Sequence, residues 1–303
     1  MAAHLHDGEG SARFRVDRRA LMHAADRASA SANVSDVTAT VPTTLARAEL
    51  LQRLQYFQLE PRVIVDLGCG TGAGAAALRQ RFPRARTIAV DLAHSMTRQA
   101  RRGQRFWRRF DCVCADACAL PFAARSVDLI FSNLMLQYCD DPAALFAEVQ
   151  RVLRPGGLLL FATLGSATLQ ELREAWTTAD VRSHVSAFTD MPQLGAAIAH
   201  AGLAEPVMDR DMQLAHFPHV EDLLHSLRAS GASHCATDRR RSLTGPKRLR
   251  AMAADYERLR TPAGIPVSWE FIYGAAFAGR TDRAADETVV PLSAVRTRLR
   301  SPS

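Results

Sequence analysis

The pattern of apolar and polar positions along the chain predicts strands that alternate with helices. The β-branched run Val63–Val65 ends in Asp66, and a glycine-rich turn then opens a helical pattern in which Leu78 and Phe82 share one face. Four further apolar runs have the length of buried strands: residues 87–90, 112–115, 127–132 and 158–163. Such alternation is typical of an α/β fold with a doubly wound parallel sheet.

The turn after the first predicted strand contains Gly68, Gly70 and Gly72. Glycine lets the chain turn tightly and lets a ligand approach the backbone, because no Cβ is in the way. The helix that follows directs its N-terminal amide groups to the same place. The same glycine spacing also occurs in dinucleotide-binding domains for NAD, so the turn by itself leaves that alternative open.

Polar side chains end four successive predicted strands: Asp66, Asp91, Asp116 and Asn133. Because the carboxyl ends of parallel strands meet at one edge of a sheet, we expect these groups to surround one crevice. Asp91 follows the glycine turn by about 20 residues, where a carboxylate can bind both hydroxyls of a ribose. Asp66 directly precedes the glycines, and its charge suits a ligand with an amino-acid end and a positive charge better than a phosphate.

Composition places the chain among ordinary soluble proteins. Its 303 residues, 48% hydrophobic and 23% charged, suffice for one large domain with an addition or for two domains. The sequence shows neither an apolar run of membrane-spanning length nor a signal peptide, so we expect a cytoplasmic protein without a membrane partner. The cysteine group Cys112, Cys114 and Cys118 lacks the paired spacing of a metal site, and we expect no metal.

The net charge of +7 comes from arginine, which supplies all but one of the 38 basic residues. With so much alanine, this ratio is typical of a bias in genome base composition, and it does not by itself predict nucleic-acid binding. The charge is concentrated in residues 239–250, which contain no acid. The basic residues there are Arg239, Arg240, Arg241, Lys247, Arg248 and Arg250.

The strand-end motifs resemble those of class I S-adenosylmethionine-dependent methyltransferases: VDLGCGTG (65–72), the acid of AVDL, and AD followed by LPF. This resemblance implies that S-adenosylmethionine is the cofactor. Gly68, Gly70 and Gly72 would cradle its methionyl end, with Asp66 beneath them near the amino group, directly or through water. The other implied cofactor residues are Asp91 and Leu92 at the ribose, Asp116 and Ala117 at the adenine, and Asn133 and Leu134 below the methyl group.

Residues 62 to 277 also resemble a narrower family, the malonyl-[acyl-carrier protein] O-methyltransferases of biotin synthesis. The similarity rests on many spaced segments, among them 132–139, 162–165, 169–176, 180–185, 206–209, 239–245, 256–257 and 270–274. The chain departs from the family at three places. Tyr138 replaces a tryptophan, Ser186-Ala187 replaces Asn-Arg, and no tyrosine follows Asp26-Arg27-Ala28 before Tyr56.

The resemblance implies a seven-stranded, mostly parallel Rossmann-like sheet whose last two strands, 206–217 and 266–277, pair antiparallel at one edge. We expect the helix 168–179 to cover the crevice as a lid. Helices are also predicted at 45–59, 191–201, 219–231 and 249–259. The expected parts are an N-terminal segment (1–44, partly disordered), the core with its lid (45–218), a helical cap insertion (219–262), the final strand (263–280) and a disordered tail (281–303).

The family methylates the free carboxylate of a malonyl thioester. This carboxylate is ionised at pH 7, so it needs no general base, and the chain has no recognisable catalytic dyad. It needs an anchor, for which arginine offers a planar fork. Arg182 and His184 are our candidates because they follow the predicted lid, although a solvated arginine and a packed histidine would explain them equally well.

The family's acyl-carrier protein is acidic, and the basic residues Arg239, Arg240 and Arg241 could speed its docking. A solvated helix face is the alternative explanation of these charges. Nucleic acid is a poor candidate partner, because aromatic residues do not interleave with the basic ones.

Three functions stay open. The first is methylation of malonyl-acyl-carrier protein or malonyl-CoA, which primes pimeloyl synthesis for biotin. The second is methylation of another small acid or hydroxyl group. The third is binding of S-adenosylmethionine without catalysis.

Overall fold

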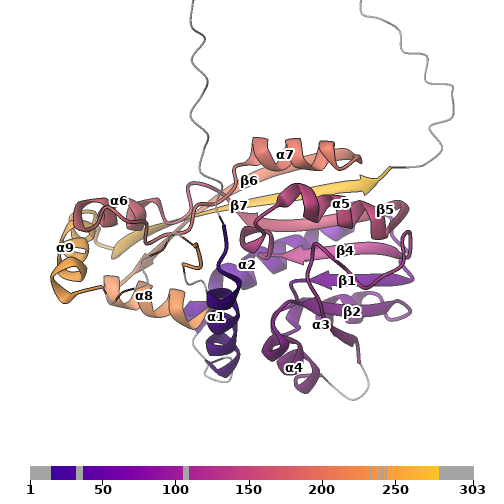
Figure 1. Ribbon diagram of the computed structural model, residues 1–303, viewed down its shortest axis with the longest axis horizontal. Coiled ribbons are helices and arrows are strands. Elements are labelled where there is room, and N and C mark those ends of the chain that lie inside the picture. Colours follow the sequence, from indigo (N-terminus) through magenta and orange to yellow (C-terminus); the bar gives the residue numbers. More distant parts are fainter. Residues whose placement is uncertain are drawn as a thin grey trace, which may run out of the picture.

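A seven-stranded sheet with strand order β3-β2-β1-β4-β5-β7-β6 forms the centre of the protein, and helices cover both of its faces (Figure 1). The computed structural model describes residues 15–31, 37–104, 109–231, 234–237, 239, 242 and 244–279. The strands are β1 (Val63–Leu67), β2 (Arg86–Asp91), β3 (Asp111–Cys114), β4 (Val127–Asn133), β5 (Leu153–Leu164), β6 (Leu203–Phe217) and β7 (Ile265–Ala278).

Strands β1 to β5 pair in parallel, whereas β7 lies between β5 and β6 and is antiparallel to both. The predicted doubly wound, mostly parallel sheet with antiparallel strands at one edge is therefore confirmed. Ile64, Val65 and Ile130 are fully buried in its centre. Strands covered on both faces can be apolar at every position, which is why their sequences are short continuous apolar runs.

The helices between and after the strands are α3 (Ala73–Arg81), α4 (His94–Arg102), α5 (Pro142–Val152), α6 (Gln170–Ala179), α7 (Met191–His200), α8 (Val220–Ala229) and α9 (Pro246–Glu257). A 3-10 turn, η2 (Leu136–Tyr138), follows β4. The predicted helices of the second half of the chain are confirmed to within a few residues. Strand β5 begins at Leu153, directly after α5, and not at 158 as predicted. Within the described ranges, no helix is both long and apolar enough to cross a membrane.

Two helices precede the sheet, in a segment where the sequence pattern predicted no regular element before residue 45. Helix α1 spans Arg18–Ser31, and α2 spans Val37–Arg53 and is followed by the 3-10 turn η1 (Leu54–Tyr56). The predicted helix 45–59 thus starts and ends too late. Helix α1 packs against α4 and α8, and its face toward Val16 and Cys235 includes the small side chain of Ala24, which is 1% exposed. Alanine contributes little to an apolar pattern, so this buried face gave no clear periodicity. Residues 1–14 and 281–303, where disorder was expected, lie outside the described residues.

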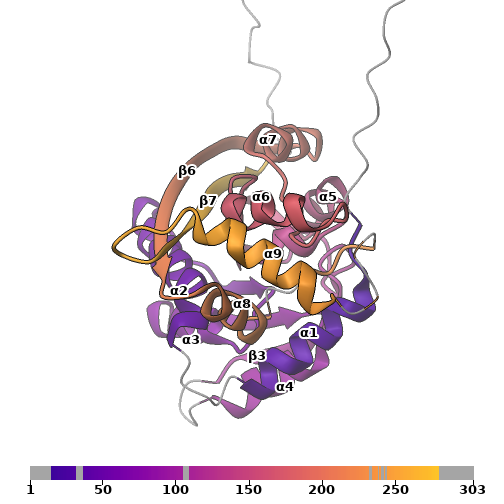
Figure 2. The same ribbon diagram turned by 90° about the vertical axis from the view of Figure 1, so that its left-hand side faces the viewer.

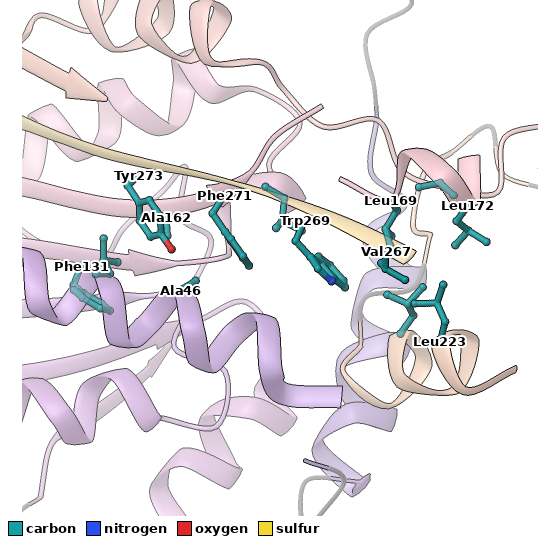
Figure 3. Packing of buried hydrophobic residues seen from close by; sticks show 14 of the residues in the cluster. Ala46, Phe131, Ala162, Leu169, Leu172, Leu223, Val267, Trp269, Phe271 and Tyr273 are labelled. Atoms are coloured by element: carbon teal, nitrogen blue, oxygen red, sulfur yellow. The ribbon is translucent and has the colours of Figure 1, made fainter. Parts of the chain in front are cut away.

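Helices α6, α8 and α9 form a helical cap at one end of the molecule (Figures 1 and 2). Strand β7 reaches the cap because its first six residues, 265–270, pair with β6 beyond the end of β5. Figure 3 shows one apolar cluster that runs from Phe131 in the sheet through Phe271 and Trp269 to Leu172 and Leu223 in the cap. The cap and the sheet therefore share a core.

Candidate cofactor and substrate site

A cavity of about 460 Å³ lies at the carboxyl ends of the central strands. The residues that follow β1, β2, β3 and β4 line it, as expected for ligand binding at the strand-order reversal of a doubly wound sheet. Of the ten residues predicted for the cofactor, nine line the cavity: Asp66, Gly68, Gly70, Asp91, Leu92, Asp116, Ala117, Asn133 and Leu134. The structure therefore brings these predicted residues together around one space.

Gly72 is the tenth predicted residue, and it is absent from the lining of the cavity. It precedes α3 with a φ of 85°, and a Cβ there would lie 2.9 Å from the Cβ of Ala100 and 3.0 Å from the ring of Phe110. At Gly68, where φ is 75°, an added Cβ would clash with the side chain of Met135. Glycine is thus required at both positions by backbone conformation and by close packing within the protein.

Asp91 holds the glycine turn in place. Its Oδ2 accepts a hydrogen bond from the Gly70 amide, and its Oδ1 accepts one from the Ala93 amide, each at 2.9 Å. Burial raises the pKa of Asp91, and the two amide donors oppose this effect. Each carboxylate oxygen has two acceptor positions, so both oxygens can still accept a hydroxyl of a bound ligand.

Asp66 is 2% exposed, and its Oδ2 has no hydrogen-bond partner in the described part of the chain. Burial raises the pKa of this carboxyl to about 7, with a contribution from the charge of Asp91, while the Ala75 amide and the charge of Arg47 act in the opposite direction. A buried carboxylate oxygen without a partner is costly. A cationic or hydrogen-bond-donating ligand group would satisfy it.

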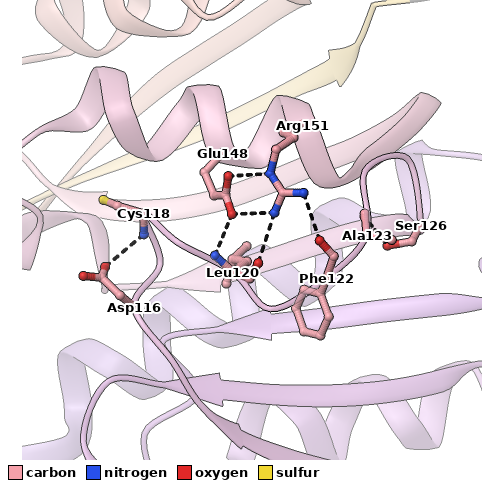
Figure 4. Close-up of polar contacts among 8 residues, drawn as sticks. All are labelled: Asp116, Cys118, Leu120, Phe122, Ala123, Ser126, Glu148 and Arg151. Carbon is pink, nitrogen blue, oxygen red and sulfur yellow. Dashed lines mark hydrogen bonds and ion pairs between the residues drawn. The ribbon is translucent and has the colours of Figure 1, made fainter.

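Asp116 closes another side of the cavity. Its Oδ1 accepts a hydrogen bond from the Cys118 amide at 2.9 Å (Figure 4), and its Oδ2 forms an ion pair with Arg18 of α1 at 2.7 Å. Helix α1 therefore contacts a predicted adenine-binding residue directly. The sequence pattern did not reveal this contact.

The loop 116–122, which carries the LPF motif, is fastened to α5 by an ion pair. Glu148 accepts a hydrogen bond from the Leu120 amide at 2.6 Å, and it pairs with Arg151 at 2.7 Å. Arg151 also donates to the carbonyls of Leu120 and Phe122 (Figure 4). Sequence reasoning missed Glu148 and Arg151, although their spacing of three residues on a predicted helix is a recognisable pair.

Asn133 connects the end of β4 to α2. Its Nδ2 donates to the Thr43 carbonyl at 3.1 Å, and its Oδ1 is buried without a partner among the described residues. Leu134 follows with a φ of 53° and lines the cavity. Tyr138 lines the same wall, and burial raises its pKa to about 12, so the phenol is neutral.

Helix α1 and the residues next to it supply a wall that the sequence analysis did not include. They are Val16, Arg18, Leu21, Met22, Ala25 and Ala28. Leu21, Ala25 and Ala28 have helical spacing, but alanine is so weakly apolar that the sequence carries only a faint signal for this element. Asp17 ties this wall to the segment before α9, because it pairs with Arg239 at 2.8 Å and its amide donates to the Cys235 carbonyl at 2.6 Å.

The residues predicted to anchor the substrate do not line the cavity. His184 packs flat on Trp176, with ring centroids 3.7 Å apart, and bonds to Asp180 at 2.9 Å. Arg182 is exposed in the loop after α6. The packed-histidine alternative thus describes the position of His184.

Helix α6, the predicted lid, also contributes no lining residue and belongs to the helical cap. Helix α6 packs on α9 and β7, whereas α1 and α2 contribute lining residues to the cavity. Of the predicted carrier-docking residues, Arg239 is 23% exposed and paired with Asp17. Arg240 and Arg241 lie outside the described residues.

Several known proteins resemble this chain in sequence or in fold. Residues 65–161 match the model of a family described as a methyltransferase domain. The fold resembles the solved structures of the YcgJ protein from Bacillus subtilis and of a putative methyltransferase from Bacillus halodurans. Their TM-scores are 0.56 and 0.53 at 16% identity, with 77% of this chain and 98% and 99% of theirs covered. This similarity shows the fold alone.

Curated relatives are much closer in sequence. A malonyl-[acyl-carrier protein] O-methyltransferase from Xylella fastidiosa is 41% identical over 84% of this chain and 88% of the relative. One from Gallionella capsiferriformans is 37% identical over 87% of this chain and 92% of the relative. The fold and the cavity are thus those of a methyltransferase. Within that class, the chain belongs to the malonyl-[acyl-carrier protein] O-methyltransferase family, which confirms the resemblance seen in the sequence.

Proposed function

We propose that this protein transfers a methyl group from S-adenosylmethionine to the free carboxylate of malonyl-acyl-carrier protein, and that the resulting methyl ester primes pimeloyl synthesis for biotin. The family of its relatives supports the reaction. The observation that carries the proposal is the cavity at the strand ends, where Asp66, Asp91 and Asp116 surround the glycine turn.

The residues of the cavity fit this cofactor. The partnerless Oδ2 of Asp66 suits the ammonium of an amino-acid end, and the two oxygens of Asp91 have acceptor positions left for two ribose hydroxyls. Leu92, Met96 and Ala117 line the cavity beside Asp116 and supply apolar contact for a purine ring. When bound, the cofactor supplies a methyl group activated by a sulfonium.

The chain itself has to orient the two reactants and exclude water. The substrate carboxylate is ionised at neutral pH, so no side chain needs to remove a proton. Attack of the anion on the cationic sulfonium cancels charge, which is favoured in a site shielded from water. Helix α1 supplies that shielding, with Leu21, Met22 and Ala25 over the cavity.

Docking of an acidic carrier is proposed at the exposed start of α9. Lys247, Arg248 and Arg250 are exposed there, on the helical cap. Arg239 is less suitable than the sequence suggested, because it is already paired with Asp17. A positive patch of this kind speeds encounter with an acidic protein and makes it sensitive to salt.

A methyl-transfer assay tests the proposal. The purified protein is incubated with labelled S-adenosylmethionine and, separately, malonyl-acyl-carrier protein, malonyl-CoA, and free small acids or hydroxylated compounds. We expect the malonyl thioesters to be methylated and the carrier-bound form to be preferred. Rescue of a biotin auxotroph that lacks this methyltransferase checks the reaction in cells. Turnover with a free acid but not with a malonyl thioester would show a diverged substrate, and cofactor binding without any turnover would show a non-catalytic protein.

A further inference from the structure

Arg47 of α2 lines the same cavity as Asp66 and is half-buried. No hydrogen bond or ion pair joins its guanidinium to another residue in the part of the chain that the structure describes. The contrast with Arg53, six residues further along α2, is clear. Arg53 pairs with Glu49 at 2.9 Å and with Asp209 at 2.8 Å, and it stacks 4.2 Å above the ring of Tyr273.

The surroundings of Arg47 make an unpaired cation costly. Burial lowers the pKa of its guanidinium, and only the charge of Asp66 opposes this effect. Arginine nevertheless stays protonated in proteins. A partly desolvated guanidinium without a contacting counter-charge is a position at which an anion is stabilising.

The other charged side chains of the cavity offer an anion no free counter-charge. Asp66, Asp91, Asp116 and Asp140 are all on its lining, and the other lining arginine, Arg18, is already paired with Asp116. An anionic ligand group would therefore be placed at Arg47. Both the amino-acid end of the proposed methyl donor and the proposed malonyl substrate carry a carboxylate.

We propose that Arg47 binds a ligand carboxylate in this cavity through its planar fork. The inference rests on the proposed function, because that function brings carboxylates into the cavity. Two sources share this chemistry. One is the α-carboxylate of the methyl donor, whose ammonium would lie at Asp66 beside it. The other is the free carboxylate of the malonyl thioester.

Calorimetry with two probes identifies the first source. S-adenosylhomocysteine carries the amino-acid end, and 5′-methylthioadenosine has the same nucleoside and thioether without it. If Arg47 holds the α-carboxylate, Arg47→Gln weakens binding of S-adenosylhomocysteine by about 10- to 100-fold and leaves 5′-methylthioadenosine within about twofold. Arg47→Lys, which keeps the charge without the fork, is expected to recover part of the loss.

Steady-state kinetics identifies the second source. If Arg47 holds the malonyl carboxylate, Arg47→Gln leaves both probes unchanged and raises KM for the malonyl thioester by about 10-fold or more. Arg53→Gln is the matched control on the same helix, since Arg53 is not among the lining residues, and it should change neither ligand's affinity. Thermal unfolding of each variant checks that the fold is kept.

Two outcomes would overturn the inference. One is Arg47→Gln with both affinities and KM within twofold of wild type, and the other is an equal loss for the two nucleoside probes, which would indicate a structural role only. Failure of the proposed function is recognised separately, as a wild-type protein that binds S-adenosylhomocysteine and does not methylate malonyl thioesters. In that case the comparison of the two probes alone decides the role of Arg47.

Discussion

Single residues at the strand ends define what the cavity can bind. Asp91 is the clearest example, because its two oxygens bond to the backbone on either side and still have acceptor positions toward the ligand. Its position was predicted from spacing alone. Its second role, holding the Gly70 amide, became visible only in the structure.

Replacement of Asp91 should weaken nucleoside binding. We expect Asp91→Ala to reduce the affinity for S-adenosylhomocysteine by about 10- to 100-fold, because a charge-assisted hydrogen bond contributes about 1.5–3 kcal/mol. Isothermal titration calorimetry measures this change. The control is Asp111→Ala, which removes an exposed acid of β3 that is paired with Arg86 and is not on the cavity lining. Unchanged affinity in Asp91→Ala would contradict the assignment to the ribose.

Asp66 should make the stability of the ligand-free protein depend on pH. Its pKa is about 7 in the folded protein and near 3.8 as a free side chain, because burial disfavours the charge. Between these values the folded protein binds a proton that the unfolded chain has lost. The Asp66 contribution to the free energy of unfolding therefore falls as pH rises from about 4 to about 7, by at most about 1.4 kcal/mol per pH unit, and is constant above 7.

Denaturant unfolding at a series of pH values tests this sign. Other carboxyl groups contribute their own pH dependence, so the measured quantity is the difference between wild type and Asp66→Asn. That difference should change between pH 4 and pH 7 and level off above 7. A flat difference over the whole range would show that Asp66 titrates normally.

At the scale of elements, helices hold the binding loops in place. Helix α5 holds the loop 116–122 through Glu148 and Arg151, and α1 covers the cavity while its Arg18 pairs with Asp116. Neither contact could be derived from a local pattern, since each joins residues that are distant in sequence or lie in an element without clear periodicity.

Removal of Arg151 should loosen the loop that carries Asp116 and Ala117. We expect Arg151→Met to lower the free energy of unfolding by about 1–2 kcal/mol and to increase amide hydrogen exchange in residues 116–122. Arg154→Met is the matched control, because Arg154 is equally exposed, at 40%, and pairs with Asp128 outside this loop. Equal exchange in the loop for both variants would rule out the role assigned to Arg151.

Detachment of α1 should speed ligand release. Ala24 is 1% exposed and packs with Val16 and Cys235, so Ala24→Glu buries a charge at this contact. We expect S-adenosylhomocysteine to dissociate at least about 10-fold faster from this variant. The melting temperature of the protein should change little. Stopped-flow fluorescence measures the dissociation, with the exposed Arg19→Glu on the same helix as control. Equal dissociation rates would show that α1 does not gate the cavity.

At the scale of the whole molecule, the long strands β6 and β7 extend the sheet beneath the helical cap, and one apolar cluster joins the two. Helix α9 of the cap carries exposed basic residues, and the cap shares its core with the sheet that forms the cavity. This arrangement agrees with the two proposed binding roles: the strand ends bind the cofactor, and the cap binds the carrier protein.

Charge reversal on α9 should affect only the carrier-bound substrate. We expect the triple change Lys247→Glu, Arg248→Glu, Arg250→Glu to raise KM for malonyl-acyl-carrier protein by about 10-fold or more at low salt, and to leave KM for malonyl-CoA within about twofold. Steady-state kinetics at two salt concentrations measures both. Reversal of Arg84, in the turn before β2, and of Arg98 on α4, both exposed, is the control. Equal effects on both substrates would contradict docking on α9.

The sequence by itself determined the sheet and nine of the residues around its cavity. Buried parallel strands are short continuous apolar runs, and the turn chemistry at their ends is local, so spacing along the chain locates Asp66, Asp91, Asp116 and Asn133. The antiparallel pairing of the edge strands came from the family resemblance, because β7 pairs with strands that are distant in sequence and no local pattern predicts such a pairing.

Only the tertiary structure decided which cations face the cavity. An arginine on a helix or loop looks the same in sequence whether it is solvated, paired or directed at a ligand. Burial and long-range partners distinguish the three cases, and they place Arg182 in solvent, Arg239 against Asp17, and Arg47 in the cavity without a partner among the described residues. The same holds for α1, whose alanine-rich face becomes a buried wall only when α4 and α8 pack against it.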